Sequence, residues 1–389
     1  MRRLLFCAVA GWLILLSGRA FAYPQFQFSS GTGRCSQCHY DPAGGGLITS
    51  WGRDESGDTI SLGGDGAFLH GAWTPPSWLA LGASVRLALL ENNSGGPAAP
   101  EVAFFPMQAD AYARVAFTDA LSLYVQGGFR GDTRPSDSSV SGQFKTLAGR
   151  LDTNEHYLMW KPSGTGPYVR AGRFFAPYGL RFVEHIFFVQ RYTGYNLYDE
   201  TYNLSAGWVE DEWEAHVTAF TPPPNSFPDS LQAVETHESG LAAYAEKRWN
   251  SMAMLGVQTR LGFGSEANRF QGGAVGKLWL EKGRALFMAE ADLIRLQVPA
   301  ASAGETGMVS YLGLTIFPKR GWMVGVAHEF QQSDLSVRET GRNAIDFELN
   351  FFPWAHFELL AFGRYQVTGT GGAGDPNASL FMFQLHYYL

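Results

Sequence analysis

Beyond Pro76 the chain alternates between segments of roughly ten residues with a two-residue hydrophobic period and links rich in turn residues. Within a segment, apolar and polar side chains take opposite faces, so that Phe287 and Leu293 oppose Glu290. A period of two predicts β-strands with unlike faces. Sixteen segments follow this pattern: 78–90, 103–117, 121–130, 156–161, 167–175, 201–209, 212–220, 240–249, 252–261, 269–280, 285–296, 308–317, 321–330, 343–352, 356–366 and 379–389.

The links alternate in length, because those after even-numbered segments are only a few residues long and those after odd-numbered segments are longer. Short turns at one end, long loops at the other and an even strand number are typical of outer-membrane barrels. We therefore predict an all-β fold, an antiparallel barrel of about sixteen strands over 76–389, in the bacterial outer membrane and surrounded by its lipid. The long links are 91–102, 131–155, 176–200, 221–239, 262–268, 297–307, 331–342 and 367–378.

Residues 1–22 have the pattern of a secretory signal peptide. Two arginines precede an apolar run from Leu4 to Leu16, which is too short to span a bilayer as a helix. An Ala-x-Ala site at 20–22 predicts cleavage after Ala22, so the mature chain is expected to begin at Tyr23. One of the three cysteines, Cys7, would be lost with this peptide.

The two remaining cysteines, Cys35 and Cys38, precede His39 in a Cys-x-x-Cys-His sequence. This spacing is that of c-type haem attachment, in which the thiols add to the two vinyl groups and the imidazole binds the iron. A local disulfide or half of a zinc site is the alternative, but a zinc site would need a second cysteine pair, which the sequence lacks. We therefore predict one covalent haem c.

Residues 23–75 are Gly-rich and irregular, and they are too few to bury much of a core by themselves. We expect this mono-haem cytochrome segment to pack in or under the mouth of the barrel. It resembles the amino-terminal cytochrome segment of the fused outer-membrane cytochrome–porins of iron-oxidising bacteria. The resemblance rests on Tyr23-Pro24-Gln25-Phe26, Gly31, Gly33, Cys35-Ser36-Gln37-Cys38-His39, Pro42, Leu47 and Trp51-Gly52-Arg53.

The second axial ligand of the iron is open at this stage. A methionine is not expected, because the first one after the motif is Met107, inside a predicted strand. His70 is the simplest candidate. Tyr23 is another, since Tyr-Pro-x-Phe before Cys-x-x-Cys-His is similar to the start of cytochrome f, whose terminal amine binds the haem iron. Alternatives within the barrel are His156, His185, His216 and His328.

The resemblance implies an electron conduit, in which the haem passes electrons between an extracellular donor or acceptor, for instance Fe²⁺, and a periplasmic c-type cytochrome. The alternative is a passive diffusion porin whose haem segment is a structural or sensory plug. We expect an electron carrier rather than an enzyme, because no Arg/His pair typical of a peroxidase is recognisable. The net charge of −7 argues against a nucleic-acid partner. Acidic residues in the long links that would attract cations are Asp132, Asp137, Glu184, Asp199, Glu200, Asp229, Glu235 and Glu238.

Overall fold

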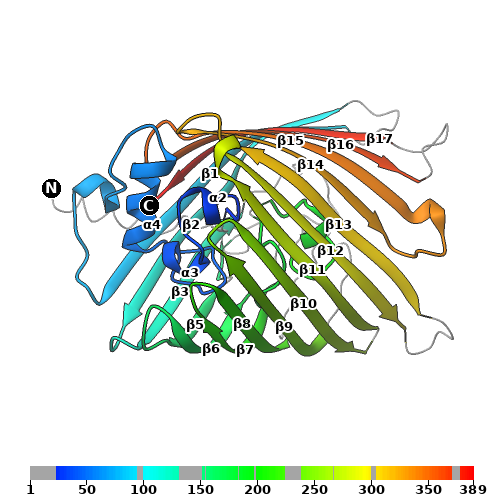
Figure 1. The fold of residues 1–389 in the computed structure, drawn as a ribbon, viewed down its shortest axis with the longest axis horizontal. Coiled ribbons are helices and arrows are strands. Elements are labelled where there is room, and N and C mark those ends of the chain that lie inside the picture. The colour runs from blue at the N-terminus through cyan, green and yellow to red at the C-terminus, as the bar shows by residue number, and fades with distance from the viewer. Residues whose placement is uncertain are drawn as a thin grey trace.

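The structure is a closed antiparallel β-barrel with the N-terminal segment lodged in one end (Figure 1). It is a computed structural model that describes residues 23–93, 100–130, 151–153, 155–182, 184–196, 199–223, 238–265, 267–298, 304–369 and 377–389. The predicted signal peptide, with Cys7, lies outside the described residues. So do Asp132, Asp137, Asp229 and Glu235.

The sheet contains seventeen strand segments among the described residues, and strand β1 pairs with both β2 and β17. Segments β4 and β5 both pair with β3, so they are two pieces of one barrel strand, and the barrel has the sixteen strands that the sequence predicted. The predicted strands are confirmed with ends shifted by a few residues. The strands are β1 (Leu79–Asn93), β2 (Glu101–Ala116), β3 (Leu121–Arg130), β4 (Leu151–Asp152), β5 (His156–Trp160), β6 (Gly166–Phe174), β7 (Thr201–Val209), β8 (Trp213–Thr221), β9 (Glu238–Trp249), β10 (Ala253–Gly264), β11 (Asn268–Leu280), β12 (Ala285–Gln297), β13 (Glu305–Ile316), β14 (Trp322–Gln332), β15 (Gly341–Phe351), β16 (Phe357–Thr368) and β17 (Asn377–Tyr388).

Helical turns are short and lie mainly in the N-terminal segment, residues 23–75. None of the helices in the described part of the chain is both long and apolar enough to cross a membrane. The helical elements are α2 (Phe26–Ser29), α3 (Cys35–Cys38), α4 (Ser50–Glu55), η1 (Ser56–Ile60), η2 (Phe68–Gly71), α5 (Phe188–Arg191), η4 (Glu281–Gly283) and η5 (Arg338–Thr340).

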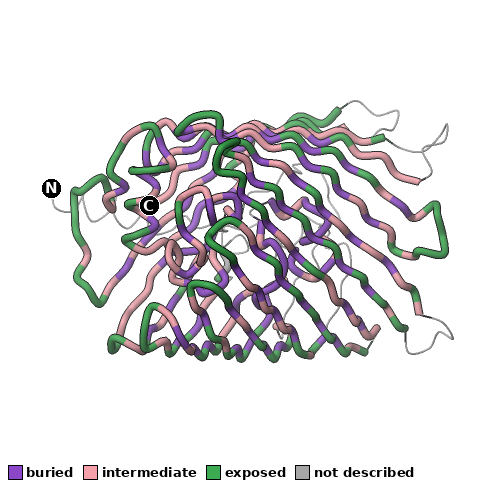
Figure 2. The backbone as a smooth tube through the Cα atoms, in the orientation of Figure 1, coloured by how far each residue is buried: buried purple, intermediate pink, exposed green. Residues whose placement is uncertain are grey.

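Exposed and buried residues alternate along the strands (Figure 2). The exposed outer positions carry many large apolar side chains, whereas many polar and charged side chains are buried on the inner surface. Large apolar side chains point outward, among them Val257 and Leu293. Such a continuous apolar face is unfavourable in water and matches the lipid-facing band of a membrane barrel. A girdle of tryptophans marks the short-turn end of the barrel: Trp78, Trp160, Trp208, Trp213 and Trp249 are all exposed there.

The N-terminal segment is fixed inside the short-turn end of the barrel by contacts with the surrounding wall. The Asp41 carboxylate forms a buried ion pair with Arg170 of β6, whose guanidinium also lies 3.7 Å from the centre of the Phe174 ring. Near the rim, Arg53 donates a hydrogen bond of 2.5 Å to the carbonyl oxygen of Leu81. The prediction that this segment packs in the barrel mouth agrees with this arrangement.

The link after β6 differs from the sequence-based expectation. Residues 175–200, here called the inward loop, fold into the lumen instead of extending outside it (Figure 1). The backbone N–H of Leu180 donates to Glu290 at 2.7 Å, and the Tyr178 hydroxyl donates to Asp292 at 2.6 Å. Lumen-facing carboxylates thus supply hydrogen-bond acceptors that attract the loop inward.

The expectation that the acidic residues of the long links lie on the outer surface is therefore wrong for several of them. Glu184 and Glu200 of the inward loop are buried, and Glu238 is buried in an ion pair with Arg260 at 2.8 Å. Asp199 accepts a hydrogen bond from the backbone N–H of Asn196. These carboxylates line the lumen wall and loop, so they do not form an outer cation-attracting surface.

The apolar outer belt makes a direct prediction about stability in lipid. Val257 is 59 % exposed on the outer face of β10, between Ala245 and Ala274 of the neighbouring strands. We expect Val257→Arg to lower the unfolding free energy in lipid vesicles by about 2–4 kcal/mol, because it places a charge near the bilayer midplane. The control, Ser265→Arg at the exposed loop end of the same hairpin, should cost about 0–1 kcal/mol. Equal effects of the two substitutions would show that this belt does not face hydrocarbon.

Candidate functional site

The Cys-x-x-Cys-His sequence forms a single helical turn, α3, that ends at His39. Positions three apart in a helix lie on one face, so the turn presents Cys35 and Cys38 on the same side. Both are free thiols. After the turn the chain becomes extended, and His39 pairs with Ile48 in an isolated β-bridge. The local fold thus brings two thiols and one imidazole together.

Helix α4 supports this turn from behind. Thr49 donates a hydrogen bond of 2.7 Å to the carbonyl oxygen of Gln37 and caps α4 by accepting from the N–H of Gly52. A side chain at Gly52 would place its Cβ 2.4 Å from the carbonyl oxygen of Cys38, so only glycine lets the two turns pack this closely. The Trp51-Gly52-Arg53 stretch therefore has a structural role, which is to hold the cysteine turn against the barrel.

One large cavity, here called the Cys–His cavity, is lined by Cys35, Cys38 and His39. The space between its walls is about 1010 Å³, including open solvent at its mouth. Apolar side chains dominate the wall, among them Phe26, Ile48 and Phe352. A mostly apolar cavity that presents two thiols and an imidazole fits the chemistry of a c-type haem.

Cys35, Cys38 and His39 are uncharged at neutral pH. Burial raises the pKa of the Cys38 thiol to about 12 and also raises the pKa of Cys35. Burial lowers the pKa of His39 to about 4, although the Asp41 carboxylate acts in the opposite direction. A neutral imidazole has the free lone pair that a metal ligand needs.

The structure brings one of the two proposed distal ligands to this cavity. Tyr23 lines it, and the Tyr23 hydroxyl donates to Glu358 of β16 at 2.6 Å. His70 is absent from its wall. A left-handed turn at Leu69 and His70 directs the chain along the rim, where His70 Nε2 lies 3.1 Å from the Tyr387 hydroxyl and its ring contacts His356.

The barrel histidines considered from the sequence lie elsewhere. His216 is buried in the lumen beside Glu214 at 3.2 Å and Tyr168 at 2.8 Å, and His328 hydrogen-bonds Asn343 on an exposed face. Among the histidines that the structure describes, His39 and His386 line the Cys–His cavity. Sequence analysis did not select His386. Its place on the polar face of the last strand predicts that it faces the lumen. Nothing in the sequence predicts which residues it meets there.

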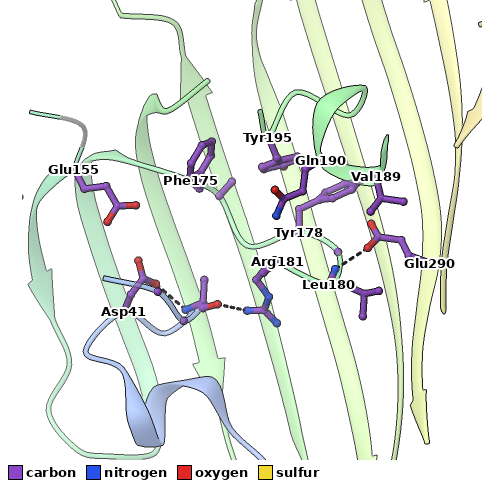
Figure 3. Close-up of a pocket in the computed structure, with 15 residues that line it drawn as sticks. Asp41, Glu155, Phe175, Tyr178, Leu180, Arg181, Val189, Gln190, Tyr195 and Glu290 are labelled. Carbon is purple, nitrogen blue, oxygen red and sulfur yellow. Dashed lines mark hydrogen bonds between the residues drawn. The ribbon is translucent and has the colours of Figure 1, made fainter. Parts of the chain in front are cut away.

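A second cavity of about 610 Å³ separates residues 41–45 of the N-terminal segment from the inward loop (Figure 3). Figure 3 shows Arg181 of the loop donating to the carbonyl oxygen of Ala43 at 3.0 Å, while Leu180 binds Glu290. The lumen is thus occupied by two packed elements in contact with each other. The N-terminal segment fills the short-turn end, and the inward loop fills the region beyond it.

Comparison with known proteins finds the fold but no family. No protein-family model matches the sequence, and no curated protein matches it. Among solved structures, OprB of Pseudomonas putida is similar with a TM-score of 0.57 and 12 % identity over 80 % of this chain and 94 % of its own. The outer membrane channel DcaP of Acinetobacter baumannii gives 0.55 and 9 %, over 82 % and 99 %. OmpF of Salmonella typhi gives 0.56 and 8 %, over 80 % and 97 %.

These likenesses define the class of the fold, an outer-membrane β-barrel of the porin type. The apolar belt of this chain matches the hydrocarbon region of that membrane, and its tryptophan girdle matches the membrane interface. At such low identity the resemblance extends to architecture alone.

The buried pair between Asp41 and Arg170 predicts how the N-terminal segment is held. Arg170→Met leaves the Asp41 carboxylate buried without its cation, a change that typically costs about 3–5 kcal/mol. We expect this segment to loosen and trypsin to cleave after Arg34 or Arg53 in the folded variant, while the wild type resists.

The control is Arg173→Met on the same strand, whose guanidinium donates to the carbonyl oxygen of Thr153 at 3.1 Å and pairs at 3.7 Å with the buried Glu200 of the inward loop, which is outside the N-terminal segment. The double variant Arg170→Met/Asp41→Asn should recover part of the protection, because no buried charge is left unpaired. If Arg170→Met resists trypsin as well as the wild type, this ion pair does not anchor the segment.

Proposed function

We propose that this barrel carries one covalently attached haem c and transfers electrons across the outer membrane, between an extracellular donor or acceptor and a periplasmic c-type cytochrome. The observation that carries the proposal is the Cys–His cavity, in which Cys35, Cys38 and His39 converge inside a porin-type barrel. A bare protein barrel has no redox group that could serve as a stepping stone across a hydrocarbon core about 30 Å thick.

The residues around the cavity have separable roles in this proposal. Cys35 and Cys38 would hold the macrocycle by thioether bonds, and His39 would bind the iron. When bound, the haem supplies one-electron chemistry, whose potential depends on the axial ligands, hydrogen bonding and burial. The apolar wall formed by Phe26 and Phe352 would exclude water from the ring faces.

The cavity lies at the short-turn end of the barrel, next to the chain terminus at Leu389. Short turns of outer-membrane barrels face the periplasm, so a haem in this cavity would lie on the side of a periplasmic cytochrome. Toward the other end, the inward loop packs Phe182 and Phe187 against Tyr311, with ring centroids 4.5 and 5.3 Å apart. Aromatic rings therefore fill part of the lumen beyond the cavity.

We propose Fe²⁺ only as an electron donor that reacts without binding at a dedicated site. No group of three or more His, Cys, Asp or Glu in the described ranges is arranged to hold a metal ion. Two of the expected surface carboxylates, Glu184 and Glu200, are buried in the lumen. An electron donor would therefore react at the outer loops without a dedicated binding site among these residues.

A passive channel with a structural or sensory haem plug is the second candidate. The observation that favours it is the likeness to porin-type barrels, one of which is described as a channel. The two candidates differ in what the lumen transmits. In the conduit the packed lumen is the functional state, whereas in the channel the plug must leave or be bypassed by solutes.

Covalent haem is tested on protein purified from the outer membrane. We expect a haem-stained band on denaturing gels and a mass increase of one haem for the mature chain. Cys35→Ala/Cys38→Ala should abolish the stain, and His39→Ala should change the visible spectrum while its thiols remain. Staining that persists in the double cysteine variant would contradict the proposal.

Planar-bilayer conductance separates the conduit from the channel. Because the N-terminal segment and inward loop pack against each other and the wall, we expect the wild-type barrel to conduct far less than a general-diffusion porin measured in the same salt. A large, stable conductance from haem-loaded protein would favour the passive channel instead.

A further inference from the structure

His386 lies on β17, faces the lumen and lines the same cavity as His39. It is only 4 % exposed. The two histidines belong to opposite parts of the chain, one on the N-terminal segment and the other on the barrel wall. Closure of the barrel, in which β17 pairs with β1, fixes the wall on which His386 stands.

The imidazole of His386 is held in a defined orientation. Its Nδ1 lies 2.8 Å from Glu358 Oε2, and Glu358 is completely buried. A carboxylate at Nδ1 places the proton on that nitrogen and leaves the lone pair on Nε2. The Ser84 hydroxyl lies 3.0 Å from Nε2 and donates to it when the ring proton is on Nδ1, so a metal at Nε2 would have to displace this neutral partner.

This arrangement is typical of histidines that bind metals. A metal-bound histidine usually donates its other N–H to a carboxylate, which fixes the ring and raises its basicity. Glu358 also accepts a hydrogen bond from the Tyr23 hydroxyl, so the same carboxylate is fixed from the N-terminal segment. No methionine is among the residues that line the cavity.

We propose that His386 is the second axial ligand of the haem iron, opposite His39, with Glu358 as the positioning residue. This inference rests on the proposed function, because it needs a haem in the Cys–His cavity. Iron bound at Nε2 would replace the hydrogen bond between Nε2 and Ser84. Tyr23 then acts through its hydroxyl on Glu358, and its terminal amine is not a ligand.

Ligation by His386 would also affect how the N-terminal segment is held in the barrel. A haem bound by Cys35, Cys38 and His39 on one side and by His386 on the other would connect the N-terminal segment to the barrel wall. The cofactor would add an attachment to the existing ones, which include the Asp41–Arg170 pair, the Tyr23–Glu358 hydrogen bond and the Arg53 contact. Haem loading would therefore fix this segment in the lumen.

The test is electron paramagnetic resonance and visible spectroscopy of the full-length, haem-loaded protein. We expect a six-coordinate, low-spin ferric haem in the wild type and a high-spin ferric haem in His386→Ala, with haem content unchanged. Added imidazole should restore the low-spin spectrum of His386→Ala. His70→Ala is the matched control and should retain the wild-type spectrum.

Two further variants keep the proposal testable if His386→Ala does not fold. His386→Met should stay low-spin with a midpoint potential more positive than that of the wild type, because thioether ligation raises the potential. Glu358→Gln should stay low-spin and also shift the potential upward, because the neutral amide gives less electron density to the imidazole. A normal heat-dependent shift on gels confirms that each barrel is folded.

The outcomes distinguish this inference from the function on which it rests. Wild-type protein without covalent haem would overturn both. Haem-loaded His386→Ala with an unchanged low-spin spectrum would overturn the ligand assignment alone. A switch to high-spin when the mature chain is extended before Tyr23, with His386→Ala unaffected, would instead assign the position to the terminal amine.

Discussion

In hydrocarbon, each unpaired backbone N–H or C=O costs several kcal/mol, so a sheet that crosses a membrane has to close on itself. Here closure is the pairing of β1 with β17, in register from Ser84 opposite Tyr388 to Asn93 opposite Ser379. The same pairing brings Ser84 beside His386, and β16 adds Glu358 on the other side of β17. The barrel closure that the bilayer requires therefore also forms the part of the Cys–His cavity wall that carries His386.

A second constraint is the polar inner surface that a period of two creates. Charged side chains inside the barrel are buried, and burial of a charge is unfavourable unless a partner is near. Many partners come from the same or neighbouring strands or from the two elements in the lumen. Arg364 binds Asp346 at 2.7 Å and also donates to the carbonyl oxygen of Ile186 in the inward loop, and Arg170 binds Asp41 of the N-terminal segment. The barrel wall and the two elements in its lumen, the N-terminal segment and the inward loop, therefore stabilise each other.

The sequence predicts the parts of this structure that depend on local pattern. Alternation along a strand sets which face is apolar, so the strand positions and the outward side chains of segments such as 285–297 are predictable. The Cys-x-x-Cys-His spacing likewise predicts a compact turn with its three groups together. The length of the links predicts which end of the barrel has the short turns.

Two kinds of feature are not predictable from the sequence. One is where along the barrel axis an inward-facing residue lies, and the other is which residues distant in the chain come into contact. Alternation shows that His386 faces inward, but it does not show that His386 shares a cavity with His39, almost the whole chain away. Nor does it show that the link after β6 turns inward, because the carboxylates that bind it, Glu290 and Asp292, come from β12. His70 is close to the motif in sequence, yet a left-handed turn takes it to the rim.

We propose that a haem inside this barrel carries electrons across the membrane, and electron transfer across lipid vesicles is the direct test. Vesicles containing the wild-type protein would enclose an oxidised periplasmic c-type cytochrome and receive a membrane-impermeant reductant outside. We expect reduction of the enclosed cytochrome with the haem-loaded barrel and none with the folded Cys35→Ala/Cys38→Ala variant. Equal reduction with both proteins, or none with the haem-loaded one, would show that the haem is not the route of the electrons.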